Sequence, residues 1–401
     1  MLPVNSFRDP VHGFVRADEL ELAIINSRPL QRLRWIRQLG FAYFVFPGAE
    51  HSRFSHVLGA MELAGEVYDT IAPKSDGLLD PESRSHDRRL VRAAALVHDI
   101  GHAPFSHSAE ELFEGGIDHE EMTRRLLDSA EMREIFSQFG DGIDPDEICR
   151  LLSVPDGPNE RLLGQIVAGE LDVDKMDYLH RDSLFCGVRY GTFDLARLVD
   201  TMLPLRDPES GEWGLGVEEG GVHALEALIM ARYYMFTQVY FNPVGKAFEL
   251  HYNEWLKEAG TSWPADPEDF LELDDVRILG RMRRSDSRHA RAVLERTHYP
   301  LAFETDEHLQ PEQLESFDSL LAELEAEYGG DAILISRSSK DPHRMGAARV
   351  FVQRYDGKLQ PMEEASHFIR HLARIDRYRV YTPPGVRQAV GDAIRGRWKF
   401  A

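Results

Sequence analysis

Apolar residues recur at spacings of three and four over much of the first 250 residues, which is the pattern of helices with one buried face. Polar or Pro- and Gly-rich stretches, such as 73–87 and 155–158, separate these segments and predict exposed loops. The clearest helical segments are 60–71, 89–100, 119–139 and 224–240. We therefore predict a mainly α fold whose helical core runs from Glu19 to about Tyr252.

A different pattern follows in the second half. Turn residues flank a short apolar run in 205–221, which predicts a small hairpin, read as an insertion. Strand-like runs at 332–336 and 349–355 enclose a stretch, 337–347, that predicts an exposed loop, and a helical pattern follows at 365–374. These elements predict a smaller α+β region behind the helical core.

The length and composition fit this division. A chain of 401 residues, with 43% hydrophobic and 28% charged residues, is typical of a soluble globular protein. We expect one domain over residues 1–300 and the α+β region over 301–401. The net charge of −22 repels duplex DNA and anionic membranes, so a phosphate-bearing partner has to be bound in a local cationic site.

Composition also bears on the compartment. Cys149 and Cys186 are too few and too far apart for a disulfide framework or a cysteine metal site, which suits a reducing cytosol. The first residues lack the pattern of a signal peptide, and no stretch approaches the apolar length of a membrane span. We expect a cytoplasmic protein without membrane contact.

Histidines are concentrated in one part of the chain, where seven of the seventeen lie between residues 51 and 119. Residues 91–97 are apolar almost all round, which predicts a buried helix, and that helix ends in His98 and Asp99. A buried carboxylate costs on the order of several kcal/mol unless it is paired or bound to a metal. A salt bridge or a helix cap is the alternative to a metal at Asp99.

Donors for a divalent metal occur on three segments. His56 precedes a predicted helix, His98 and Asp99 end another, and Asp174 lies in a third. Mixed imidazole and carboxylate shells suit ions such as Mn, Fe, Ni or Zn, and Mg is a further candidate.

The third segment, 171–182, has a regular spacing of its own. On a helix, Asp174, Tyr178 and Asp182 share one face because they are four residues apart. That face either looks into a cavity or is a solvated charged surface, and periodicity alone favours the second interpretation.

Four stretches resemble one family closely. They are FRDPVHGF at 7–14, PLQRLRWIRQLGFAYFVFPGAEHSRFSHVLG at 29–59, HDIGHAPFSH at 98–107 and LDVDKMDYLHRD at 171–182. The series of histidines and aspartates resembles the signature of the HD-domain metal-dependent phosphohydrolases. The longer stretches resemble the deoxynucleoside triphosphate (dNTP) triphosphohydrolase branch, and the resemblance covers about residues 5 to 300.

The resemblance implies roles for the reacting centre. A divalent metal is expected to polarise a phosphoryl oxygen and to activate water. The implied metal ligands are His56, His98, Asp99 and Asp174. The implied catalytic residues are His107, supported by Glu110, together with His102 and His119, which match histidines at the phosphates. Without the resemblance, the sequence predicts that His107 is a surface or capping histidine and that His119 caps a helix.

Substrate contacts are implied in the same way. The triphosphate is expected at Arg53, Lys175 and Arg232. The sugar and base are expected at Gln38, Tyr178, Asp182 and Tyr240. Tyr178 beneath the sugar would exclude a 2′-hydroxyl. Without the resemblance, the aromatic residues around Tyr240 read as a core stripe.

Regulation is less well marked in the sequence. Asn26 stands where the vertebrate relative has an aspartate that reads guanine at an effector site, whereas Gln31 and Arg34 are retained. An amide cannot accept hydrogen bonds as a carboxylate does, so guanine-specific activation is not expected. The seven arginines of 277–296 form either an effector or nucleic-acid patch or a solvated helix with ion pairs, and we favour the second.

We expect an oligomeric enzyme that splits a dNTP into a deoxynucleoside and inorganic triphosphate, with an effector nucleotide as a further partner. Two alternatives stay open: an HD phosphohydrolase acting on another nucleotide or nucleic-acid phosphoester, and a nucleotide-sensing or nucleic-acid-binding regulator.

Overall fold

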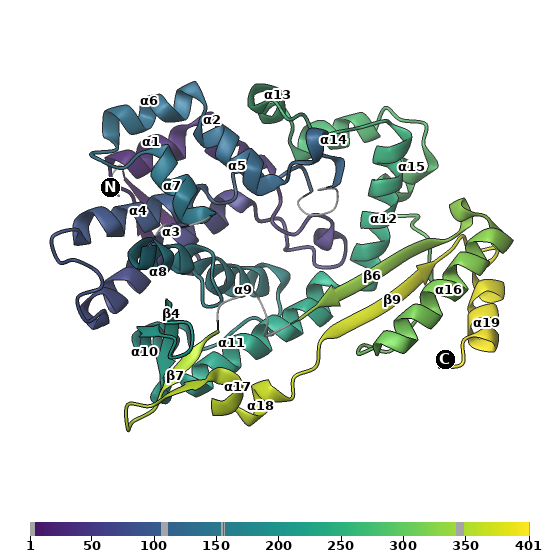
Figure 1. The fold of residues 1–401 in the computed structure, drawn as a ribbon. Coiled ribbons are helices and arrows are strands. Elements are labelled where there is room, and N and C mark those ends of the chain that lie inside the picture. The colour runs from purple at the N-terminus through teal and green to yellow at the C-terminus, as the bar shows by residue number, and fades with distance from the viewer. Residues whose placement is uncertain (1–4, 106–110, 154, 156, 342–348, 401) are drawn as a thin grey trace.

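The computed structural model describes residues 5–105, 111–153, 155, 157–341 and 349–400. Its N-terminal part is a bundle of helices, and an extended pair of strands leads to the last helices at the other end of the molecule (Figure 1). The helices before residue 202 are α1 (Glu19–Asn26), α2 (Arg28–Arg32), α3 (Arg53–Ile71), α4 (Arg84–Val97), α5 (His119–Leu127), α6 (Ala130–Phe139), α7 (Pro145–Leu152), α8 (Gly157–Val167), α9 (Val173–Cys186) and α10 (Leu195–Thr201).

The helices that follow divide between the core and the C-terminal region. They are α11 (Val222–Met235), α12 (Pro243–Glu258), α13 (Pro267–Leu271), α14 (Asp275–Met282), α15 (Arg288–Leu294), α16 (Pro311–Tyr328), α17 (Met362–Ala365), α18 (His367–Arg370) and α19 (Arg387–Arg397). The strands are β1 (Ser6–Asp9), β2 (Gly13–Arg16), β3 (Met202–Arg206), β4 (Trp213–Glu218), β5 (Leu301–Glu304), β6 (Leu334–Lys340), β7 (Phe351–Gln353), β8 (Leu359–Pro361) and β9 (Ile375–Tyr381).

Helices α3, α4 and α9 form the centre of the main core. Helix α3 is buried on nearly all sides, and α4 is buried without a break from Leu90 to Val97. Helix α9 packs against α3 at Gly59, where an added Cβ would lie 2.0 Å from Asp177 Oδ1. Since only glycine allows this approach, Gly59 determines how closely the two helices pack.

Three small sheets complete the fold of the described residues. Strands β1 and β2 form an antiparallel hairpin, and β5, β9 and β6 form an antiparallel sheet in which β9 is central. Helices α16 and α19 pack with that sheet around a separate apolar core that includes Phe317, Ile394 and Trp398. The third sheet has the order β3-β4-β7-β8, and its β4–β7 pair is parallel.

The structure confirms the mainly α fold with a smaller α+β C-terminal region. Several boundaries differ from prediction. The expected helix 119–139 is two helices, because the side chain of Ser129 accepts a hydrogen bond from Met132 N and so begins α6. The expected helix 89–100 begins earlier, at Arg84, and ends at Val97.

Other elements of the second half also depart from prediction. The hairpin in 205–221 exists as β3 and β4, but it is not isolated, since β4 pairs with β7. The expected loop 337–347 is wrong at its start, because β6 continues to Lys340. The helix expected at 365–374 is only the short α18. Among the described residues, no helix combines the length and apolar character needed to cross a bilayer.

Candidate metal and substrate site

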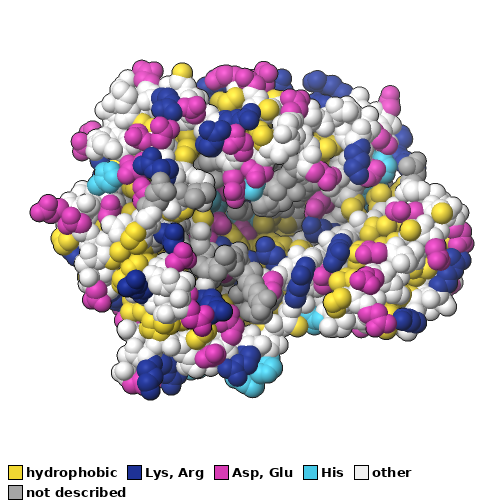
Figure 2. Space-filling model, viewed as in Figure 1, with side chains coloured by type: hydrophobic (Ala, Val, Ile, Leu, Met, Phe, Trp, Pro, Cys, Tyr) yellow, Lys and Arg dark blue, Asp and Glu magenta, His cyan; other side chains and the backbone are white. Residues whose placement is uncertain are grey.

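One large cavity, of about 1070 Å³, lies between the helical core and the C-terminal sheet. Residues of the α3, α4, α9 and α11 segments line it, and Ser339 and Lys340 of β6 complete the wall. Figure 2 shows this face of the molecule hollowed between the two parts. The cavity therefore brings segments from most of the chain to one place.

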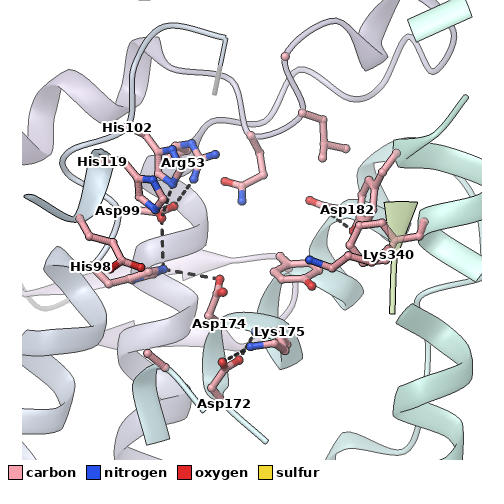
Figure 3. A pocket seen from close by; sticks show the side chains of 18 of the residues that line it. Arg53, His98, Asp99, His102, His119, Asp172, Asp174, Lys175, Asp182 and Lys340 are labelled. Carbon is pink, nitrogen blue, oxygen red and sulfur yellow. Dashed lines mark hydrogen bonds and ion pairs between the residues drawn. The ribbon is translucent and has the colours of Figure 1, made fainter. Parts of the chain in front are cut away.

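The four predicted metal ligands converge at one end of this cavity. His56 lies in the first turns of α3, His98 and Asp99 follow α4, and Asp174 lies in the first turn of α9. Ligand atoms of His56, His98 and Asp99 lie within 4.8 Å of one another. Asp174 Oδ1 lies 3.0 Å from His56 Nε2 and 3.6 Å from His98 Nε2 (Figure 3 shows His98, Asp99 and Asp174). Two imidazoles and two carboxylates thus surround one point.

The tautomers of the two histidines suit metal binding. His56 Nδ1 donates to Asp177 Oδ2 at 2.7 Å, and His98 Nδ1 donates to the carbonyl oxygen of Ala95 at 2.8 Å. In a neutral imidazole the other nitrogen then carries a lone pair. Both Nε2 atoms are buried and face the carboxylate of Asp174. Buried lone pairs beside two carboxylates are the donor set of a divalent metal site.

The pKa shifts of His56 and Asp174 also agree with a metal site. Burial lowers the pKa of His56, but hydrogen bonds to Asp174 and Asp177 outweigh it and raise that pKa to about 10. Burial raises the pKa of Asp174, but the imidazoles of His56 and His98 outweigh it and lower that pKa. Without a metal the site therefore holds a proton between imidazole and carboxylate, and a divalent ion would replace that proton.

A buried network behind the ligands holds His56 in place. The guanidinium of Arg181 donates to both carboxylate oxygens of Asp177 at 2.8 Å, and its Nη1 donates to Asp9 at 2.7 Å. His12 Nε2 contacts Asp177 Oδ1 at 2.7 Å. Sequence reasoning missed this network. Its signal was present, because Asp177 and Arg181 are four residues apart on the helix of Asp174, and the stretch 7–14 contains Asp9 and His12.

The predicted phosphate-binding histidines lie on the far side of Asp99. His102 Nε2 lies 3.1 Å from Asp99 Oδ1, and the His102 ring stacks on His119 with centroids 4.3 Å apart. Arg53 Nη1 donates to Asp99 Oδ2 at 2.5 Å. These three side chains gather beside Asp99 in Figure 3. His107 and Glu110 lie outside the described residues, so their catalytic roles stay predictions.

The opposite end of the cavity has a polar wall. The hydroxyl of Tyr240 donates to Asp182 Oδ2 at 2.8 Å, and His51 Nε2 lies 2.8 Å from Asp182 Oδ1. Tyr178 packs edge-on against Tyr240, with ring centroids 6.2 Å apart. The side-chain amide oxygen of Gln38 (Oε1) is buried and has no hydrogen-bond partner in the described part of the chain. His51, which sequence reasoning did not select, is buried and supports this wall through its contact with Asp182.

Lysine and arginine side chains line the space between these ends. Lys175 Nζ donates to the carboxylate of Asp172 and, at 2.9 Å, to the carbonyl oxygen of Gly169. Arg232 is buried and lines the same cavity. Among the arginines of 277–296, none lines it.

The structure thus brings most of the predicted site residues together. Those that line the cavity are Gln38, Arg53, His98, Asp99, His102, His119, Asp174, Lys175, Tyr178, Asp182, Arg232 and Tyr240. His56 completes the cluster beneath them. The interpretation of 171–182 as a solvated charged face is wrong, because Asp177, Arg181 and Asp182 are fully buried.

Comparisons with known proteins agree with this site. Residues 53–182 match the HD domain, and residues 193–398 match the HD associated region. The uncharacterized protein YwfO of Bacillus subtilis (strain 168) is 36% identical over 294 residues, which are 68% of this chain and 64% of that protein. The deoxynucleoside triphosphate triphosphohydrolase SAMHD1 homolog of Dictyostelium discoideum is 33% identical over 295 residues, 69% of this chain and 54% of that protein.

A solved structure extends the likeness to nearly the whole chain. The crystal structure of a hypothetical protein from Aquifex aeolicus has a TM-score of 0.82 at 30% identity, covering 97% of this chain and 99% of that one. The two curated relatives are longer proteins, of which this chain spans about half to two thirds. The matched regions and the His–Asp cluster together show that the chain belongs to the HD-domain phosphohydrolase family, in the form that carries an HD associated region.

Proposed function

We propose that this protein is a metal-dependent dNTP triphosphohydrolase, which splits a dNTP into a deoxynucleoside and inorganic triphosphate. The observation that carries the proposal is the layout of one cavity. Metal ligands lie at one end, the Asp182–Tyr240 wall lies at the other, and basic side chains lie between them. Its volume of about 1070 Å³ is at the upper end of the usual ~300–1,000 Å³ for small-molecule sites. The triphosphohydrolase relatives add support.

The metal would be held by His56, His98, Asp99 and Asp174. A divalent ion held there would polarise a phosphoryl oxygen and lower the pKa of a bound water. Asp177 keeps the His56 imidazole oriented by accepting its Nδ1 proton. Arg53, beside Asp99, compensates negative charge on the α-phosphate.

The remaining residues bind and orient the nucleotide. Lys175 and Arg232 neutralise the charge of the phosphate chain. The buried side-chain oxygen of Gln38 accepts a hydrogen bond from a hydroxyl or amino group of the nucleotide. Asp182, held by Tyr240 and His51, can accept a hydrogen bond from the 3′-hydroxyl. The proposed proton donor to the departing 5′ oxygen is His107 with Glu110.

Product analysis tests the proposal. Purified protein with Mn²⁺ or Mg²⁺ is incubated with each dNTP, alone and in mixtures, and the products are separated by anion exchange. We expect deoxynucleoside and triphosphate in equal amounts. Asp174→Asn removes a proposed ligand and should abolish turnover, whereas Asp194→Asn, at the exposed start of α10, should not.

Other outcomes favour other functions. Turnover confined to mixtures would support an effector nucleotide, and oligomer formation on adding dNTPs would support the proposed assembly. Pyrophosphate or orthophosphate as the product would contradict triphosphohydrolase chemistry and favour another phosphoester substrate. Nucleotide binding without turnover under every condition would favour a nucleotide-sensing regulator.

A further inference from the structure

The C-terminal sheet contributes a basic side chain to the cavity. Strand β6 ends at Lys340, which pairs in register with Ile375 of β9. Ser339 and Lys340 line the cavity, and Figure 3 shows the lysine reaching into it from the opposite side to His98. The region after residue 300 therefore forms part of the site wall.

Lys340 has no counter-charge among the described residues. Its ammonium group lies 5.2 Å from the ring centroid of Phe236, and no carboxylate pairs with it in the described part of the chain. Lys175, by contrast, is paired with Asp172. Burial, followed by the charges of Arg232 and Lys175, lowers the pKa of Lys340. Three cationic side chains thus face one space, and one of them lacks an acidic partner.

Three cationic side chains around one cavity raise the free energy of the folded protein unless an anion binds between them. Like charges in a partly buried site repel each other, and desolvation weakens their hydration. A bound phosphate chain reverses both effects, because each ammonium or guanidinium can donate charge-assisted hydrogen bonds to it. The cluster therefore fits a ligand with several negative charges in a row.

The position of Lys340 indicates which part of the ligand it meets. In Figure 3, Lys175 lies beside Asp174, a proposed metal ligand, whereas Lys340 lies on the opposite side of the cavity from His98 and Asp99. Lys340 thus lies beyond Lys175 as seen from the metal end. If the α-phosphate reacts at the metal, the phosphates beyond it extend toward Lys340.

We propose that Lys340 is a triphosphate-binding residue, supplied by the C-terminal α+β region, that contacts the β- or γ-phosphate. The inference rests on the proposed function for the identity of the nucleotide, but not for the anion site itself. It gives the C-terminal region a direct part in recognition of the triphosphate chain.

Binding of inorganic tripolyphosphate tests this inference without turnover. The full chain, loaded with Mn²⁺, is titrated calorimetrically with the Mn²⁺ complex of tripolyphosphate, and separately with deoxyadenosine. Lys340→Met removes the charge and keeps the length, and Lys340→Arg keeps the charge. Lys358→Met is the matched control, because Lys358 is an exposed lysine of the same region that pairs with Asp356 and does not line the cavity.

We expect Lys340→Met to weaken tripolyphosphate binding by about tenfold, which corresponds to the loss of one charge-assisted contact. Deoxyadenosine binding and the thermal unfolding midpoint should not change. Lys340→Arg should recover most of the affinity, and Lys358→Met should behave as wild type.

Several results would overturn the inference: wild-type protein that binds no tripolyphosphate, Lys340→Met with wild-type affinity, or equal losses for tripolyphosphate and deoxyadenosine. The proposed function fails separately. If wild-type protein releases no triphosphate from any dNTP while Lys340→Met still loses tripolyphosphate affinity, the anion site stands and the dNTP assignment falls.

Discussion

Replacing Asp177 by asparagine should weaken metal binding although Asp177 is not a proposed ligand. The carboxylate accepts the Nδ1 proton of His56 at 2.7 Å and two hydrogen bonds from Arg181 at 2.8 Å, and it lies 2.7 Å from His12 Nε2. An amide offers one acceptor oxygen and no charge. His56 therefore becomes a weaker donor and is held less firmly.

The size of the effect follows from the kind of contact. Loss of the partner that orients a metal-bound histidine costs about 10- to 100-fold in affinity, or about 1.4–2.7 kcal/mol. The change also leaves the fully buried Arg181 with Asp9 as its remaining carboxylate partner. Removing one partner of a buried ion pair destabilises a fold by about 3–5 kcal/mol. Metal affinity and stability should therefore fall together.

A matched variant separates the two effects. Glu21 pairs with Arg92 at 2.6 Å, and both side chains are as buried as the Asp177 network, but neither lines the cavity. Glu21→Gln should lower the free energy of unfolding, measured by urea titration in EDTA, and leave the affinity for Mn²⁺ unchanged. Asp177→Asn should lower both. The reasoning would be refuted if Asp177→Asn bound Mn²⁺ with wild-type affinity, or if Glu21→Gln lost as much Mn²⁺ affinity as Asp177→Asn.

Three further predictions concern packing, pH and sugar selection. Gly59→Ala should destabilise the protein strongly, since its Cβ would lie 2.0 Å from Asp177 Oδ1, whereas Gly280→Ala, with nothing within 4 Å, should be neutral or stabilising in the same urea titration. Burial lowers the pKa of His251 to about 3. At pH values below about 6.5, the pKa of a histidine in the unfolded chain, the unfolded protein therefore binds a proton at His251 that the folded protein does not. Stability should thus fall from pH 6.5 toward pH 4.5 by up to about 1.4 kcal/mol per unit, and His251→Gln should flatten that slope; an unchanged slope would count against this. Tyr178→Ala should admit ribonucleotides at the sugar end of the cavity, and unchanged discrimination in a competition assay would contradict that role.

The convergence of the metal-ligand candidates could be predicted chiefly because four local stretches of the sequence resemble one family. The buried helix ending in His98 and Asp99 marked one part of the site. The spacing from Asp174 to Asp182 alone favoured a solvated face, which the burial of Asp182 contradicts. The helix break at Ser129 was missed, although a serine followed by helix-forming residues is a capping signal.

Contacts between distant segments could not be predicted. The pairing of β4 with β7 depends on two short strands far apart in the chain, and neither strand encodes its partner. The same holds for Lys340, which enters the site only because β6 continues beyond its apolar run and lies across from α9. Asp177 was hidden for another reason, since a carboxylate inside a charged helix resembles a surface residue until its burial is known.

The position of bond cleavage tests the central claim most directly. Hydrolysis of a dNTP by the Mn²⁺-loaded protein in ¹⁸O-labelled water, followed by mass spectrometry of the products, shows which atom the water attacks. Attack at the α-phosphorus breaks the bond to the 5′ oxygen, so we expect one ¹⁸O atom in inorganic triphosphate and none in the deoxynucleoside. Label in the deoxynucleoside, or release of pyrophosphate with a deoxynucleoside monophosphate, would contradict the account.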